Sequence, residues 1–262
     1  MTPELVEFLT LAPIGFAVGA YGTLVGAGGG SVLVPVLIFL YPHADPAGLT
    51  AISLAVVFFN AYSGTVAYMR MGRVNYRAGT LFTLASIPGA ILGTMLVHDL
   101  PRHLFDTLFG LMLVCVGSLL VVNPLGTRTD ESRESTCLAS PEGDIVGSIG
   151  SAYIAVLSCL LGIGGGIIHV PFLIRILKFA PHTATATSHF VLTFMALTAT
   201  VTHVVMGQLG TQLTETLSLG VGVMMGAPLG AALSTRLRGS IIVRVLALAL
   251  CLVGARLLMR VF

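Results

Sequence analysis

The stretch Gly26-Ala27-Gly28-Gly29-Gly30 decides the fold, and it occurs twice. The second copy, Gly162-Ile163-Gly164-Gly165-Gly166, begins 136 positions later, and a proline (Pro35 or Pro171) follows each copy five residues after its last glycine. Because each glycine costs a helix about 1 kcal/mol relative to alanine, four glycines in five residues predict a helix break. Both breaks fall in apolar segments. In a membrane, irregular backbone is tolerated only against protein or a water-filled cavity.

The composition predicts an integral membrane protein with the lipid bilayer as its surroundings. Only 9% of the 262 residues are charged and 55% are hydrophobic, whereas a soluble domain has about 25% charged residues. The basic residues cluster at the ends of apolar segments, so the net charge of +2 does not indicate a nucleic-acid partner. The four cysteines are scattered without a CxxC motif, which favours small buried residues over a disulfide or a metal site.

Ten apolar segments are separated by short polar loops and one long polar stretch. A full membrane span needs about 20 residues, so two of the segments, 31–41 and 166–178, are too short to cross. Residues 124–144 are the long polar stretch, which we predict to be a cytoplasmic linker. The apolar segments run over 5–25, 31–41, 48–69, 78–97, 104–123, 145–162, 166–178, 184–206, 212–234 and 241–259.

The segments on either side of the linker form two copies of one unit, which we place at 1–123 and 145–262. The matches extend beyond the glycine stretches and keep their order along the chain. Two matched interruptions in corresponding positions of two halves are the usual sequence sign of a transporter's substrate site. The matched pairs are Ser53 and Ser188, Tyr68 and His203, and Gly72 and Gly207 at offset 135, with Gly89 and Gly226, and Gly93 and Gly230, at offset 137.

Charge asymmetry predicts the orientation, because cytoplasmic loops are enriched in Lys and Arg. Suppose that the loop carrying Arg70, Arg73 and Arg77 is cytoplasmic and that each glycine-broken pair returns to its own side. Ten of the thirteen Lys and Arg residues are then cytoplasmic, and both termini are outside. We therefore predict an all-α membrane protein of two inverted repeats, each a glycine-broken re-entrant helix pair plus three transmembrane helices. The alternative is that the first limbs, 5–25 and 145–162, cross alone.

The glycine stretches are the first candidate binding site, and they favour an anion. No acidic residue falls in the middle of an apolar segment, whereas cation transporters usually place carboxylates there. A helix N-terminus offers free N–H groups and the positive end of the helix dipole. The alternative is that the glycines only allow close helix packing. The candidate residues are Gly28, Gly29, Gly30 and Ser31 in the first copy and Gly164, Gly165 and Gly166 in the second.

Polar side chains inside the spans are the second group of candidates. A single Ser or Thr often bonds a carbonyl of its own helix, but Ser53 and Ser188 match in both halves. A buried histidine is either structural or contacts the anion or a proton, since its side chain titrates near neutrality. The histidine spacing places no two of them at i, i+4, so we predict no metal site. The candidates are Ser53, Asn60, His169, Thr187, Ser188, His189 and His203.

The chain resembles the sulfite exporter TauE/SafE family in both glycine motifs with their prolines, in Ser53 and Thr187-Ser188 on the following helices, and in the small-residue runs 89–93 and 226–230. The resemblance covers nearly the whole chain. It implies a multi-pass transporter of the bacterial inner membrane that carries sulfite, thiosulfate or organosulfonates without a cofactor. The family often has a Thr-Ser pair after the first motif. Here Ile52-Ser53 stands there, so the two halves of the site need not be equivalent.

We therefore expect a transporter of small sulfur-containing anions that works by alternating access, with one half rocking against the other around the glycine breaks. The expected partners are a small anionic substrate and the bilayer, without a cofactor, a catalytic residue or a metal. One alternative is a carrier of another small organic anion. A second is a metal-dependent membrane enzyme that uses the histidines, and a third is a scaffold protein. No feature of the sequence specifies the coupling ion, the direction of transport or the oligomeric state.

Overall fold

The computed structural model describes residues 3–26, 28–122, 141–209, 212–234 and 239–261, and within these ranges all regular structure is helical. Each of the ten predicted apolar segments is a helix, with ends within a few residues of the predicted ones. Most of the predicted linker lies outside the described residues, and its last four residues, 141–144, form the first turn of α6. The helices are α1 (Pro3–Val25), α2 (Gly30–Leu40), α3 (Pro46–Arg70), α4 (Tyr76–His98), α5 (Arg102–Val122), α6 (Pro141–Leu160), α7 (Gly166–Arg175), α8 (Pro181–Val205), α9 (Leu213–Leu233) and α10 (Gly239–Val261).

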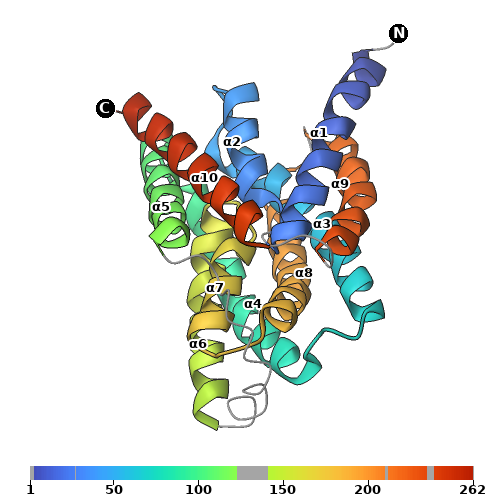
Figure 1. Cartoon of the computed structure of the whole chain (residues 1–262). Helices are drawn as coiled ribbons and strands as arrows, with labels where there is room; N and C mark the ends of the chain where they lie inside the picture. The colour runs from blue at the N-terminus through green and yellow to red at the C-terminus, as the bar shows by residue number, and fades with distance from the viewer. Residues whose placement is uncertain (1–2, 27, 123–140, 210–211, 235–238, 262) are drawn as a thin grey trace.

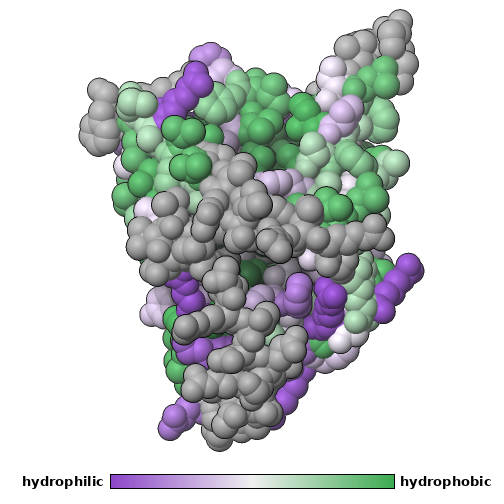
Figure 2. Space-filling model, viewed as in Figure 1, coloured by the Kyte–Doolittle hydropathy of each residue, from purple (hydrophilic) through white to green (hydrophobic). Residues whose placement is uncertain are grey.

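The chain is a multi-pass membrane protein by the length and character of its helices. Among the described residues, seven helices are long and apolar enough to cross a membrane, whereas α2 and α7 are short. Large apolar side chains such as Tyr153, Val205 and Leu252 are more than 70% exposed, as expected for residues that face lipid. Figure 2 shows the same pattern, because apolar residues cover the flanks while hydrophilic ones gather mainly at the lower end.

The two halves of the chain interlock. The first helix of each half packs along the fourth helix of the other, so that α1 lies on α9 and α6 lies on α4. The third helices, α3 and α8, pack together, as do the fifth helices, α5 and α10 (Figure 1). Exchanging the two halves therefore exchanges or preserves every one of these pairings.

The small-residue runs allow the closest of these contacts. A Cβ at Gly89 or Gly93 of α4 would overlap with the backbone of α6, at Ala152 and Val156 respectively. A Cβ at Gly226 of α9 would likewise overlap with the α1 backbone at Phe16. Helices in lipid associate through such close backbone contacts, because burial from water does not drive them together.

This interlocking does not fit the expectation that one half of the sequence rocks against the other. Such a motion would separate α1 from α9, α6 from α4 and α5 from α10, which are the most extensive helix contacts among the described residues. Any unit that moves as a rigid body therefore has to combine helices from both halves.

Candidate functional site

The two glycine stretches form matching turns that begin the short helices α2 and α7. Gly29 (φ 81°, ψ −24°) and Gly165 (φ 86°, ψ −19°) are the N-cap residues, and both adopt the left-handed conformation that glycine tolerates. The N–H groups of Val32 and Leu33 return to the carbonyl of Gly29. Gly30 and Gly166, the first residues of α2 and α7, are buried, so both helices begin inside the protein. The first N–H groups of such a helix have no partner within it.

The two turns contact each other directly. A Cβ at Gly30 would overlap with the carbonyl of Ile163 in the second turn. Both turns also rest on the same two side chains, because Cβ atoms at Gly28 and at Gly164 would each overlap with or touch Val57 of α3 and Leu192 of α8. The first residue of α2 therefore lies against the second glycine turn inside the protein.

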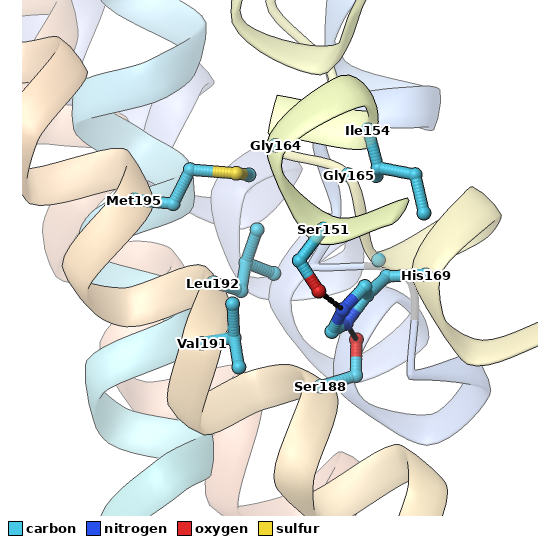
Figure 3. A pocket seen from close by; sticks show the side chains of 10 residues that line it. Ser151, Ile154, Gly164, Gly165, His169, Ser188, Val191, Leu192 and Met195 are labelled. Atoms are coloured by element: carbon cyan, nitrogen blue, oxygen red, sulfur yellow. Dashed lines mark hydrogen bonds between the residues drawn. The ribbon is translucent and has the colours of Figure 1, made fainter. Parts of the chain in front are cut away.

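The second turn lines a small cavity with His169 of α7 at its wall (Figure 3). The ring of His169 lies between two hydroxyls: Nε2 is 3.0 Å from Ser151 Oγ of α6, and Nδ1 is 3.2 Å from Ser188 Oγ of α8. Leu192 and Met195 of α8 line the apolar side of the cavity. The cavity volume is about 10 Å³, which is roughly the space of one water-sized sphere.

The first turn has a different set of polar neighbours. Asn60 of α3 accepts a hydrogen bond from Thr23 Oγ1 of α1 at 3.0 Å, and its amide nitrogen points toward Gly29. Tyr68 donates to the Thr23 carbonyl at 3.0 Å and meets the ring of His189 edge-on, with 5.3 Å between ring centroids. The two turns therefore share a backbone geometry but differ in side-chain chemistry.

Several buried polar atoms near the turns have no hydrogen-bond partner among the described residues. They are Asn60 Nδ2 beside Gly29, Ser31 Oγ at the start of α2, Ser158 Oγ beside Gly165, and His189 Nε2 facing Gly64. Leaving a buried polar group unpaired costs roughly 1–3 kcal/mol, so a group of such atoms needs an explanation. The hydroxyls and the amide nitrogen can all donate to an anion.

Ser53 joins the two halves at the second turn. Its hydroxyl donates to the carbonyl of Gly162 at 2.6 Å, whereas the matching Ser188 is bonded to His169. Both serines thus lie at the second turn, and their hydrogen bonds differ.

Substituting Ser53 with alanine is expected to destabilise the protein by about 1–2 kcal/mol, because the buried Gly162 carbonyl loses its donor. Ser118→Ala is the control, since that hydroxyl is exposed and bonds only the Cys115 carbonyl of its own helix. Thermal unfolding in detergent should show a lower Tm for Ser53→Ala alone. Equal Tm values for both variants would contradict a structural role of the Ser53 bond.

Two predicted candidates lie away from the turns. Thr187 accepts a hydrogen bond from the backbone N–H of Asn75 at 3.1 Å, so it anchors the loop between α3 and α4. His203 is bonded to Gln208, which in turn contacts His98 at 2.8 Å, near the ends of α8 and α4. Along α8, His203 is roughly 22 Å from Ser188. The other predicted candidates lie at or beside the glycine turns.

No charged residue is among the buried polar residues that the structure describes. In the parts of the chain that the structure describes, the buried polar residues are only Ser, Thr, Asn and His. The described residues also contain no group of three His, Cys, Asp or Glu side chains that could hold a metal ion. Because no Lys or Arg is among the described buried residues, the N-termini of α2 and α7 are the fixed source of positive potential at the turns.

Residues 11–257 match the family model of the sulfite exporter TauE/SafE. The chain belongs to this family. It is 28% identical over 269 aligned positions to the probable membrane transporter protein YunE of Bacillus subtilis, with 97% of this chain and 98% of the relative covered. A probable membrane transporter protein of Xylella fastidiosa is 27% identical, covering 87% of this chain and 83% of the relative. No solved structure matches the chain.

Three buried residues at the TauE/SafE glycine turns were missed in the sequence: Thr23, Ser151 and Ser158. Each lies in the apolar helix that precedes a turn, α1 or α6. None of the three is matched by a hydroxyl residue in the other half, where Cys159, Gly15 and Gly22 stand at offset 136. The only signal in the sequence was a polar residue in an apolar helix. The structure is needed to show that this residue faces the interior of the protein rather than the lipid.

Proposed function

We propose that this TauE/SafE protein transports small sulfur-containing anions, such as sulfite, thiosulfate or an organosulfonate, across the membrane. The observation that carries the proposal is the direct contact of two left-handed glycine turns, each at the N-terminus of a buried helix. Such termini attract anions through free N–H groups and the helix dipole.

The side chains around the turns support an anion that makes many hydrogen bonds. Asn60 Nδ2, Ser31 Oγ and Ser158 Oγ are buried donors without partners among the described residues. Pyramidal and tetrahedral oxyanions of sulfur offer three oxygens to such donors, which suits donors carried by several helices. A cation would find neither a carboxylate nor a metal-binding cluster among the described buried residues.

The conformation seen here is closed, since the cavity has space for about one water molecule and an oxyanion is larger. Substrate entry therefore requires the turns to separate from the side chains that hold them. Val57 of α3 and Leu192 of α8 contact both turns, and these contacts have to open. Transport then proceeds by alternating access around the glycine turns.

The direct test is exchange of labelled for unlabelled anion in proteoliposomes at equal pH on both sides. Sulfite, thiosulfate and methanesulfonate should exchange, whereas a neutral sulfonamide should not. Acetate in the same assay tests the alternative of a carrier for other small organic anions. Exchange of acetate without exchange of the sulfur-containing anions would overturn the proposed substrate class. Absence of exchange for all of them would overturn transport of small anions.

The two halves are proposed to be inverted repeats, as the positive charges predict. In Figure 1, α1 begins at the top of the molecule and descends, whereas α6 begins at the bottom and rises; the end of α10 is again at the top. Arg77 at the start of α4 pairs with Asp144 at the start of α6 at 2.9 Å, so these two helices begin at the same side.

Cysteine labelling tests this topology in a cysteine-free background. In such a protein, Tyr76→Cys should react with an impermeant thiol reagent only from the cytoplasm, and Leu209→Cys only from outside, because α8 separates the two loops. Tyr76 is about half exposed, so the introduced thiol is accessible. Labelling of both positions from the same side would contradict the inverted arrangement.

A further inference from the structure

The ring of His169 is held by two serine hydroxyls, and this arrangement suits both of its protonation states. Nε2 faces Ser151 Oγ at 3.0 Å and Nδ1 faces Ser188 Oγ at 3.2 Å. A hydroxyl can donate or accept, whereas a neutral imidazole has one donor and one acceptor and an imidazolium has two donors. The two serines can therefore satisfy either neutral tautomer and also the cation, without any loss of hydrogen bonds.

The rest of the ring's surroundings is apolar. Phe82 of α4 meets the ring edge-on and Phe172 of α7 lies parallel to it, with centroids 6.4 and 6.2 Å away. No charged side chain contacts the ring among the described residues of α4, α6, α7 and α8. Those helices carry their charges near their ends, where Arg77 pairs with Asp144 and where Arg175 lies in the last turn of α7.

The other histidines of α8 face elsewhere. His189 follows Ser188 in sequence but points to α3, where it meets Gly64 and Tyr68. His203 is bonded to Gln208 near the far end of the helix. His182, at the start of α8, is exposed. His169 is thus the only titratable side chain among the residues that line the described cavity.

The duplicated half shows that the fold does not require a histidine at this position. At offset 136 from His169 stands Leu33 of α2, which is fully buried, and at the same offset from Ser151 stands Gly15 of α1. An apolar pair therefore fills this place in one half of the same architecture, and a histidine with its hydroxyl partner fills it in the other. A purely packing role would be served by the apolar pair.

We propose that His169 binds one proton together with the anion, so that the protein is a proton–anion symporter. The inference rests on the proposed function. The proton comes from the aqueous side to which the site is open and binds the unprotonated ring nitrogen. The serine that faces this nitrogen, Ser151 or Ser188, then accepts a hydrogen bond from it instead of donating one. The proton leaves to water on the other side. A cation buried beside the N-terminus of α7 is costly, and so is an anion without a counter-charge.

Anion and proton therefore favour each other's binding, and linkage makes this effect reciprocal. The site then crosses the membrane either with both ligands or with neither, which is the condition for obligatory coupling. Methanesulfonate is the suitable probe, because its charge stays at minus one over the physiological pH range. For such an anion the one-to-one cycle is electroneutral, and each pH unit of gradient should support about tenfold accumulation.

The experiment compares two measurements in the same proteoliposomes, with the membrane potential clamped by potassium and its ionophore. One is exchange of methanesulfonate at equal pH, and the other is its accumulation when the outside is more acidic by one unit. We expect both in the wild type, with about tenfold accumulation. The double variant His169→Leu, Ser151→Gly installs the residues of the other half and should lose the accumulation. The control His182→Gln changes an exposed histidine and should keep it.

The outcomes separate this proposal from the proposed function. Exchange without gradient-driven accumulation in the wild type overturns proton coupling and leaves anion transport standing. Absence of exchange overturns the transport proposal itself. Accumulation that persists at about tenfold in the double variant shows that His169 is not the proton carrier. If the double variant binds no anion, proton uptake by the wild type in weakly buffered detergent solution is the deciding measurement. We expect the wild type to take up about one proton per methanesulfonate bound. Binding of methanesulfonate without proton uptake would overturn the proposal.

Discussion

Gly30→Ala is expected to lower the transport rate by about a hundredfold or more in protein that still folds. The backbone of Gly30 is not in the left-handed region, so alanine causes no conformational strain. Its methyl group would, however, overlap with the Ile163 carbonyl of the opposite turn. The two turns would have to move apart by about 1 Å, and misplacement of binding groups by this much costs on the order of a hundredfold in rate.

Gly15→Ala is the matched control for this substitution. Its methyl group would overlap to nearly the same extent with a backbone carbonyl, that of Leu219, in the contact between α1 and α9. Both variants should lose similar amounts of folded protein. Transport per folded molecule, measured at matched incorporation into proteoliposomes, should fall only for Gly30→Ala. If Gly30→Ala transports like the wild type, contact between the turns is not needed for transport.

Asn60→Asp is expected to weaken anion binding by about a hundredfold or more. The aspartate keeps the acceptor for Thr23 but removes the unpaired amide donor beside Gly29 and adds a negative charge there. A lost hydrogen bond to a charged ligand costs about 1.5–3 kcal/mol, and like charges repel further in a low-dielectric site. The dissociation constant of methanesulfonate, measured at about pH 8 by calorimetry, should rise accordingly.

Asn75→Asp provides the same chemical change outside the site. Asn75 caps α4 by accepting from the Ala78 N–H at 3.1 Å, and aspartate caps helices equally well. Its methanesulfonate affinity should match that of the wild type. Wild-type affinity in Asn60→Asp would show that Asn60 does not bind the anion. Ser158 and His169 at the other turn would then be the remaining candidates.

The sequence predicted the helices well because membrane-spanning segments can be recognised by their length and hydropathy. All ten segments were located, and the left-handed caps at Gly29 and Gly165 follow from runs of glycine that no helix accommodates. The interlocking of the halves was missed, because apolar helices of similar length carry little information about which helix is the neighbour. Small residues such as Gly89 and Gly226 indicated close helix contacts but did not indicate which helix is the partner.

The site was predicted less completely, for a related reason. Backbone breaks and repeated residues are visible in one dimension, and these led to the turns, Ser53 and Ser188. A matched position does not ensure a matched role, however. Tyr68 and His203 correspond in the two halves, yet Tyr68 donates to Thr23 close to the first turn while His203 is bonded to Gln208 near the end of α8.

The exchange of helices between the halves bears on how the chain is assembled during synthesis. The partners of α1, α3, α4 and α5 are mostly helices that the ribosome makes later, so the first half enters the bilayer with its main contact surfaces unoccupied. These surfaces then contact lipid or the insertion machinery until the second half has been inserted. Two separately expressed halves should consequently assemble when produced together, whereas the first half alone should be degraded.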